Sequence, residues 1–149
     1  MLLYAAYGAS LDPARMAARC PHSPLLGTGW LLGWRLTFGG EEYGWDGALT
    51  TAVEDPDQQV FVALYEVADE DRDALADSEG SAYGLYDRLH VRVQTLEGEK
   101  LAVIFVLKAY EGGLPSAATI GALYEAALAA GAPDDYLEDL RSRPCRSIG

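Results

Sequence analysis

Glu79 and Tyr86 are the residues whose types and spacing most suggest catalysis. Glu79 follows a charged, helix-like segment in the stretch LADSEGSAYGLYDR, and Tyr86 stands further on, at the start of a strand-like run. The C-terminal end of a helix over residues 69–78 places a negative dipole beside Glu79, which disfavours ionisation and raises the pKa of a shielded carboxyl group. A base and a phenol then face one cleft. The alternative is a solvated Glu and a packed Tyr.

The segment YGASL, residues 7–11, is the second candidate. It joins an apolar, strand-like run at residues 2–6 to the helix start DPARMAAR, in which Asp12 is the predicted cap and Pro13 the first helical residue. Successive backbone N–H groups at such a junction can converge on an anion or on a developing oxyanion. An ordinary glycine turn is the alternative.

The elements that must position these residues are strands interleaved with helices. Residues 27–47 mix aromatic residues with many glycines, which predicts short, strongly bent strands and favours a small barrel. The clearest hairpin joins the alternating residues 87–96 to the apolar run KLAVIFVLKAY across a turn at Glu97 and Gly98. Further strands are predicted at 46–53 and 60–67, on either side of an EDPD turn, and helices at 116–130 and 134–143. The predicted fold class is α+β, with five to seven strands and helices as covers.

Length and charge limit the class of protein. The chain has 149 residues, which fit a single domain over 1–149. Its 23 acidic and 11 basic residues give a net charge of -12, which repels nucleic-acid backbones and anionic lipid surfaces. No apolar run approaches the roughly 20 residues that cross a bilayer. We therefore expect no nucleic-acid partner and no membrane association, and an anionic ligand needs local backbone amides or a specific Arg.

The cysteines and histidines argue against a metal site. Cys20 and Cys145 lie far apart, and the opening MLLYAAYG has no basic region of a secretory signal, so we expect free thiols in a cytoplasmic protein. Together with His22 and His90 they lack the close paired spacing of a structural zinc site. The chain also has no GxSxG elbow, HExxH helix, Walker loop or dinucleotide fingerprint. No metal and no cofactor are predicted.

Four segments, in order along the chain, resemble the γ-glutamylcyclotransferase family. LYAAYGASLDPARMAARCP resembles the family's YGSNL-like loop and short helix, and WLLGWRLTFGG resembles the strand that follows. VFVALYEVADEDRDALADSEGSAYGLYDRLHVRV resembles the block with the LDxxEG pattern. KAYEGGLPSAATIGALYEAALAAGAPDDYLEDL resembles the C-terminal pattern with its PS helix start and Pro-x-x-Tyr. The resemblance covers nearly the whole chain.

The resemblance implies a small mixed β-barrel with peripheral helices, and an enzyme that cyclises a γ-glutamyl group to 5-oxoproline and releases an amine. The substrate's α-amine attacks its own γ-carbonyl carbon, a ring closure that needs no enzyme nucleophile or metal. Glu79 is implied as general acid and base, and backbone amides of the YGASL loop as donors to the α-carboxylate or the oxyanion. The residues implied to bind substrate are Tyr7, Gly8, Ala9, Ser10, Leu11 and Tyr86.

Four positions depart from the family pattern. Ala9 and Ser10 stand in place of Ser and Asn, Ala76 in place of the Asp of LDxxEG, and Thr119 in place of an aromatic residue. Losing a buried hydrogen-bond partner costs about 1–3 kcal/mol. A non-catalytic γ-glutamyl or small-molecule binding protein of the same fold is therefore the alternative, and an acyl-transfer enzyme or hydrolase using an external nucleophile is a third possibility.

The expected partner is a small-molecule γ-glutamyl substrate, and the protein is a monomer or a homodimer. Loops at residues 39–46 and 111–115 are expected to form the leaving-amine side of the pocket, because binding residues concentrate on loops held by a rigid scaffold.

Overall fold

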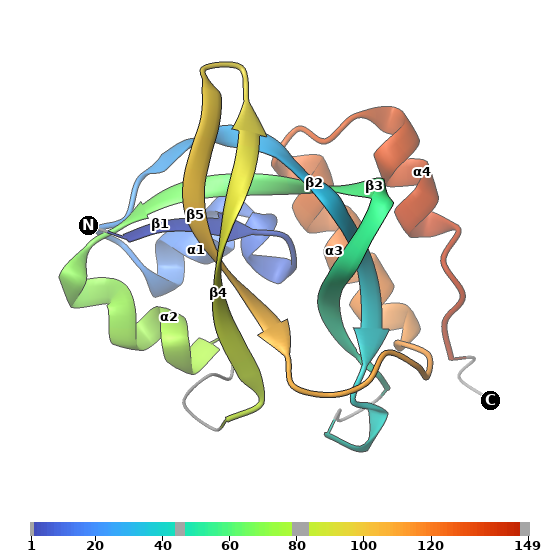
Figure 1. Ribbon diagram of the computed structural model, residues 1–149. Coiled ribbons are helices and arrows are strands. Elements are labelled where there is room, and N and C mark those ends of the chain that lie inside the picture. Colours follow the sequence, from blue (N-terminus) through green and yellow to red (C-terminus); the bar gives the residue numbers. More distant parts are fainter. Residues whose placement is uncertain (1, 44–46, 79–83, 147–149) are drawn as a thin grey trace.

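The computed structural model describes residues 2–43, 47–78 and 84–146 and contains a closed, five-stranded barrel in that part of the chain (Figure 1). The strands follow the order β1–β3–β2–β4–β5 around the barrel. Their bounds are Leu2–Ala6 for β1, Leu25–Gly39 for β2, Leu49–Val67 for β3, Tyr86–Thr95 for β4 and Gly98–Leu107 for β5. β1 and β5 pair in parallel and the other neighbours are antiparallel, so the predicted α+β class with a small mixed barrel is confirmed.

The ribbon of β2 and β3 differs from the sequence-based expectation. The predicted short strands within 27–47 are one long strand, and the predicted strands at 46–53 and 60–67 are parts of a single strand β3 that runs through the EDPD segment. Leu32 pairs with Gln59 but Trp34 pairs with Glu54, so residues 55–58 bulge opposite Gly33, whose φ is +81°. Because Pro lacks a ladder donor, it is tolerated at such a bulge. The bends in these strands were therefore predicted correctly, but the predicted division into short separate strands was wrong.

The hairpin of β4 and β5 was predicted correctly. Its ladder runs in continuous register from Tyr86–Leu107 to Thr95–Gly98. The hairpin projects from the barrel beside the β2–β3 ribbon (Figure 1). Val91 and Val93 of β4 are buried, whereas Leu96 at the turn is fully exposed. The hairpin's base, at Tyr86 and Leu107, lies at the end of the barrel where the candidate site is found.

The helices begin where the sequence predicts. In α1 (Pro13–Arg19), Asp12 caps the helix, with its Oδ1 accepting a 3.0 Å hydrogen bond from the Ala14 N–H. In α3 (Ala117–Ala129), the Ser116 hydroxyl accepts a 3.0 Å hydrogen bond from the Thr119 N–H. α2 (Arg72–Ser78) follows a 3₁₀ turn at Asp69–Asp71, and α4 (Asp134–Arg141) is the last helix of the described residues. In the described part of the chain no helix is both long and apolar enough to span a membrane.

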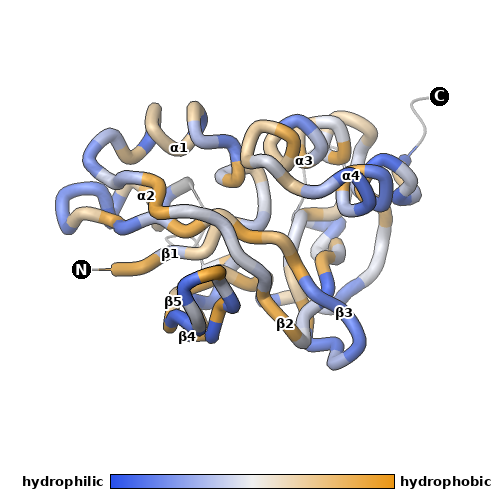
Figure 2. The backbone as a smooth tube through the Cα atoms, turned by 90° about the horizontal axis from the view of Figure 1, so that it is seen from above, coloured by the Kyte–Doolittle hydropathy of each residue, from blue (hydrophilic) through white to orange (hydrophobic). Residues whose placement is uncertain are grey.

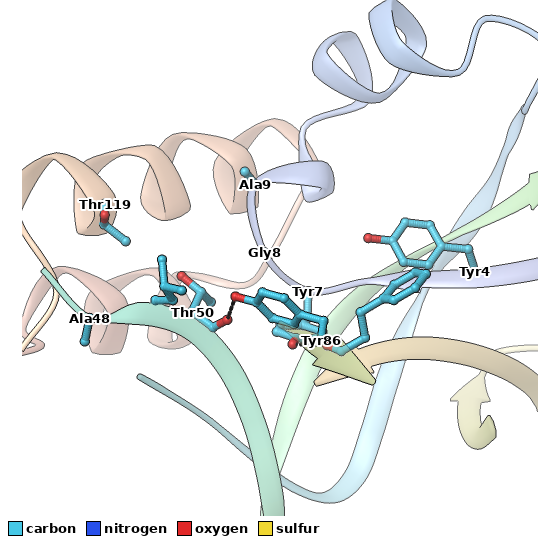
Figure 3. A pocket seen from close by; sticks show the side chains of 10 residues that line it. Tyr4, Tyr7, Gly8, Ala9, Ala48, Thr50, Tyr86 and Thr119 are labelled. Atoms are coloured by element: carbon cyan, nitrogen blue, oxygen red, sulfur yellow. Dashed lines mark hydrogen bonds between the residues drawn. The ribbon is translucent and has the colours of Figure 1, made fainter. Parts of the chain in front are cut away.

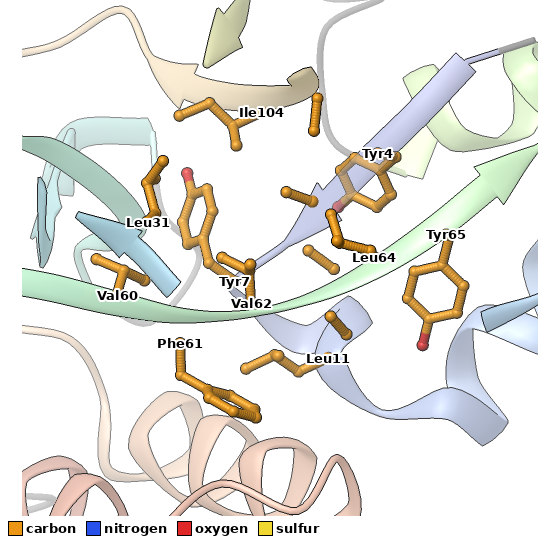
Figure 4. Packing of buried hydrophobic residues seen from close by; sticks show 14 of the residues in the cluster. Tyr4, Tyr7, Leu11, Leu31, Val60, Phe61, Val62, Leu64, Tyr65 and Ile104 are labelled. Carbon is orange, nitrogen blue, oxygen red and sulfur yellow. The ribbon is translucent and has the colours of Figure 1, made fainter. Parts of the chain in front are cut away.

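The core explains why β3 is apolar without alternation over residues 60–65. Val60 and Val62 point into the barrel toward Ile104, whereas Phe61 points outward toward the C-terminal helices (Figure 4). There the Phe61 ring lies 5.8 Å from the ring of Tyr136 on α4. Both faces of β3 are therefore covered, one by the barrel interior and one by a helix. Seen from above, α1, α3 and α4 lie on one side of the barrel and the β4–β5 hairpin on the other (Figure 2).

Candidate active site

A cavity of about 220 Å³ opens at the end of the barrel where β1 leads into α1. It brings together segments that are far apart in the sequence: the loop after β1, the start of β3, the start of β4, the end of β5 and the first turn of α3 (Figure 3). The described residues that line it are Tyr4, Tyr7, Gly8, Ala9, Ala48, Leu49, Thr50, Tyr86, Phe105 and Thr119. None of these residues carries a formal charge at neutral pH.

The YGASL loop is divided between the cavity and the protein interior. Tyr7, Gly8 and Ala9 line the cavity. Ser10 and Leu11 are 2% and 1% exposed and do not belong to the described lining; the Ser10 hydroxyl accepts a hydrogen bond of 3.4 Å from Arg19. The chain turns here in a 3₁₀ helix at Ala9–Leu11, which directs successive side chains to different sides.

Two residues of this loop that line the cavity, Gly8 and Ala9, carry main-chain N–H groups. The hydrogen bonds of the turn use the N–H groups of Leu11, to the Gly8 carbonyl at 3.0 Å, and of Asp12, to the Ala9 carbonyl at 3.2 Å. The turn's own bonding therefore does not engage the N–H groups of Gly8 and Ala9. Backbone N–H groups in such a turn suit an anion or an oxyanion, as the sequence suggested.

Two tyrosine hydroxyls hold the walls of the cavity. Tyr7 is buried and its hydroxyl donates a hydrogen bond to the carbonyl of Phe105 on β5. Tyr86 donates a hydrogen bond of 2.8 Å to the carbonyl of Thr50 on β3, drawn as a dashed line in Figure 3. The Tyr4 ring packs edge-on against Phe105 at a centroid distance of 5.8 Å. The cavity is therefore enclosed by side chains bonded to the barrel strands.

The remaining wall depends on the segment before α3. The Ala48 N–H donates a hydrogen bond of 2.9 Å to the Leu114 carbonyl, and the Ser116 cap then starts α3, which carries Thr119 to the cavity. Gly39 pairs with Glu111, and a Cβ on Gly39 would meet the Tyr110 carbonyl oxygen at 2.5 Å. Only a glycine allows this close approach between the end of β2 and the 108–116 segment.

Glu111 anchors the same segment through charge. Its carboxylate accepts hydrogen bonds from Arg35 and from the hydroxyl of Thr37, both on β2, and Arg35 also donates to Asp55 at 3.0 Å. The hydrogen bond from Arg35, and then that from Thr37, hold the pKa of the Glu111 carboxyl group below its usual value. The same pairing raises the pKa of the Arg35 guanidinium. The ion pair stabilises the backbone that positions Ala48 and Thr119.

The residues predicted from the sequence fall into three groups by their location in the structure. Tyr7, Gly8, Ala9 and Tyr86 are brought together at the cavity. Ser10 and Leu11 are packed behind it. Glu79 lies outside the described residues, between Ser78 at the end of α2 and Gly84, so its predicted role is not addressed by the geometry.

Sequence reasoning did not select the other lining residues as binding residues. Thr119 was noted only as a departure from a family pattern. The others are Tyr4, Ala48, Leu49, Thr50 and Phe105, which carry no charge or metal-ligating group. Residues of these types occur in every apolar strand, so their sequence holds no chemical signal. Only the register of the barrel places them at one end.

The chain is similar to known proteins in sequence and in fold. Residues 59–140 match the AIG2-like family. Human γ-glutamylcyclotransferase is 26% identical over 145 residues, covering 94% of this chain and 77% of that protein. A solved γ-glutamyl cyclotransferase structure superposes with a TM-score of 0.89 at 25% identity, covering 99% of this chain and 91% of its own. YkqA from Bacillus subtilis shares the fold at a TM-score of 0.82 and 18% identity, over 97% of this chain and 56% of its own.

Proposed function

The chain belongs to the AIG2-like family, and from that premise we propose that it is a γ-glutamylcyclotransferase-type enzyme that converts a γ-glutamyl group to 5-oxoproline and releases an amine. The observation that supports this most directly is the meeting of Tyr7, Gly8 and Ala9 with Tyr86 at one cavity. These residues come from opposite halves of the barrel sequence. The family pattern in the sequence marks the same residues, and the matches to γ-glutamylcyclotransferases extend over nearly the whole chain.

The reaction is an intramolecular transfer. The α-nitrogen of the substrate forms a bond to its own γ-carbon, the bond from that carbon to the leaving nitrogen breaks, and one proton moves from the first nitrogen to the second. Because the two reacting atoms belong to one molecule, effective molarity lowers the barrier without an enzyme nucleophile. The protein must supply a base, donors to the oxyanion and a proton for the leaving amine.

Glu79 is the proposed general acid and base. The described lining provides hydroxyl groups, backbone amides and aromatic faces, and it contains no carboxyl, imidazole or amine group. Glu79 directly follows Ser78, the last residue of α2, and carries the carboxyl group that this set lacks. The N–H groups of Gly8 and Ala9 are the proposed donors to the substrate's α-carboxylate or to the oxyanion, which allows an acidic protein to hold an anionic group.

The substrate is proposed to be a small γ-glutamyl compound, with glutathione as one member of the class, and the protein to act in the cytoplasm without a cofactor. A cavity of about 220 Å³ lies below the roughly 300–1,000 Å³ of pockets that enclose drug-sized ligands. Its size suits a glutamyl group, with the leaving amine extending beyond it.

The test is a screen of γ-glutamyl amino acids, γ-glutamyl amines and glutathione for 5-oxoproline release, detected by mass spectrometry. Glu79→Gln should abolish release while the protein keeps its circular dichroism spectrum and melting temperature. Glu97→Gln is the matched control, because Glu97 lies at the exposed hairpin turn and pairs only with Lys100 at 3.5 Å among the described ion pairs. Undiminished turnover in Glu79→Gln would show that Glu79 is not the general acid and base. Free glutamate as the product would indicate hydrolysis instead of cyclisation.

A second candidate function is non-catalytic binding of a γ-glutamyl compound. It is favoured by Ala9 and Thr119, two departures from the family pattern that both line the cavity. Binding without turnover predicts that γ-glutamyl ligands raise the melting temperature and yield no 5-oxoproline, even in a variant carrying Ala9→Ser and Ser10→Asn. Product formation by the unmodified protein excludes this alternative.

A further inference from the structure

A second hollow, of about 520 Å³, lies beside the candidate active site at the end of β5. Its described lining is Glu42, Tyr43, Leu107, Lys108, Ala109 and Tyr110. Leu107 is the cross-strand partner of Tyr86, which lines the first cavity. Phe105, two residues before Leu107 on the same face of β5, also lines the first cavity, so lining residues of the two spaces lie about 7 Å apart along one strand.

The position of this hollow suits the part of a substrate that the first cavity leaves outside. The first cavity has room for a glutamyl group, and the group attached to its γ-carbonyl must continue toward the surface. The rim of the hollow comes from the loop after β2 and the segment after β5, and β5 also lines the first cavity through Phe105. A leaving group that extends from the first cavity past Leu107 would enter this hollow.

Two aromatic side chains at the hollow face solvent. Tyr110 is 97% exposed and Tyr43 is 57% exposed. A Cβ built on Gly40 would lie 3.0 Å from Leu107 and 3.4 Å from the Tyr43 ring, so the ring and the leucine converge on the same small space. Exposed tyrosine rings offer a large apolar surface at low cost in side-chain entropy, which is typical of binding surfaces.

The charges of the hollow disfavour an acidic occupant. Lys108 is its cation, and its Nζ lies 3.2 Å from Asp87 Oδ1, which neutralises it. Glu42 adds a carboxylate to the lining. A leaving group with a second carboxylate therefore meets a net negative surface in a protein of net charge -12.

We propose that this hollow binds the side chain of the leaving amino acid or amine, and that it selects aromatic or large aliphatic groups over small or acidic ones. The inference rests on the proposed cyclotransferase function and adds the substrate class. Tyr110 and Tyr43 are the specificity-determining residues, and they contact the leaving group rather than the reacting atoms.

The experiment compares kcat/KM for 5-oxoproline release from γ-glutamyl-phenylalanine, γ-glutamyl-glycine and γ-glutamyl-glutamate. Partial burial of an aromatic ring predicts a preference of about 10-fold or more for the phenylalanine compound over the glycine compound. Tyr110→Ala and Tyr43→Ala should each lower kcat/KM for γ-glutamyl-phenylalanine about 3- to 10-fold and leave γ-glutamyl-glycine within about twofold. Leu96→Ala, which removes an exposed apolar side chain at the distant hairpin turn, should change neither rate.

The outcomes separate the inference from the function on which it rests. Release of 5-oxoproline from all three compounds at similar kcat/KM, or an equal loss for all three in the tyrosine variants, overturns the specificity assignment and leaves the cyclotransferase function standing. If the folded protein releases no 5-oxoproline from any γ-glutamyl compound, both the specificity assignment and the cyclotransferase function are wrong. A selective loss for γ-glutamyl-phenylalanine supports the assignment of the hollow.

Discussion

The hydroxyl group of Tyr86 donates a 2.8 Å hydrogen bond to the main-chain carbonyl of Thr50, and both residues line the candidate active site. Tyr86 is the first residue of β4 and Thr50 the second of β3, strands that are not neighbours in the barrel order. Thr51 reinforces this link, because its hydroxyl accepts a hydrogen bond of 2.9 Å from the Leu107 N–H. The bonds close one end of the barrel around the cavity.

Tyr86→Phe should therefore destabilise the wall of the candidate active site and have little effect on the catalytic step. The ring stays and the hydrogen bond to Thr50 is lost, so the free energy of unfolding should fall by about 1 kcal/mol, or the melting temperature by about 2–4 °C for a protein of this size. We expect kcat/KM for 5-oxoproline release to fall less than about 10-fold. A fall of more than about 100-fold with unchanged stability would mean that the hydroxyl touches the reacting atoms.

Ala9→Ser tests whether the cavity accepts a further donor. Ala9 lines the cavity, so the added hydroxyl can reach a γ-glutamyl ligand without disturbing the core. One hydrogen bond of about 1 kcal/mol predicts a Kd for γ-glutamyl ligands about fivefold lower, measured by calorimetry. Ala129→Ser, at an exposed position near the end of α3, is the control and should leave the Kd unchanged. Weaker binding in Ala9→Ser would show that the space beside Ala9 is already filled by the ligand.

The parts of the fold that were predictable are those in which a local signal agrees with the final environment. Asp12 and Ser116 were predicted as helix caps, and both accept the expected hydrogen bonds. The EDPD segment misled the prediction because Pro and Asp are depleted in strands. Here Pro56 lies in a bulge opposite Gly33, where no ladder donor is needed. A bulge is a property of two paired strands, which a single segment does not reveal.

The candidate site was predictable only where a residue carries a recognisable pattern. Tyr7 and Tyr86 lie at the cavity because β1 ends and β4 begins there, and the family pattern marks both. Leu11 belongs to the same pattern but is 1% exposed in the core, because the 3₁₀ turn rotates it away from the cavity. Phe105 is an ordinary strand residue in the sequence. It reaches the cavity through the parallel pairing of β1 and β5, which joins positions about 100 residues apart.

Glu111→Gln should destabilise the protein at neutral pH and less so in acid. The pKa of Glu111 is lowered in the folded state by hydrogen bonds from Arg35 and Thr37, so its stabilising contribution is present above the unfolded pKa and is lost as the pH falls through the folded pKa. The pair is partly exposed to solvent, which limits the contribution to about 1 kcal/mol or less, or about 2–4 °C at pH 7. The difference in melting temperature from the unmodified protein should shrink between about pH 5 and pH 3.

Glu138→Gln is the matched control for this prediction. Glu138 pairs with Arg141 at 2.7 Å on the exposed surface of α4, with both side chains more than 60% exposed. Such a pair contributes about 0.5 kcal/mol or less, so the control should melt within about 2 °C of the unmodified protein at every pH. Equal shifts for the two variants would contradict the anchoring role of Glu111.

Tyr65→Phe should leave the protein as stable as before or make it more stable. Tyr65 is 2% exposed, and its hydroxyl has no hydrogen-bond partner within the described residues. A buried hydroxyl without a partner costs about 1–3 kcal/mol, so its removal should raise the free energy of unfolding by up to that amount. Tyr110→Phe removes the same group from a fully exposed ring and should have no effect. Urea denaturation at pH 7 measures both variants.

The same substitution has a distinct signature at alkaline pH. Burial raises the pKa of Tyr65 to about 12, whereas an unfolded tyrosine titrates near 10. The unfolded state therefore releases a proton first, and folding stability that is complete below pH 10 declines as the pH rises from 10 toward 12. Tyr65→Phe removes this contribution, so its free energy of unfolding should decline less steeply over that range than that of the unmodified protein. Parallel declines would mean that Tyr65 already ionises freely, and hence that its hydroxyl reaches water through an opening of the 13–25 segment that surrounds it.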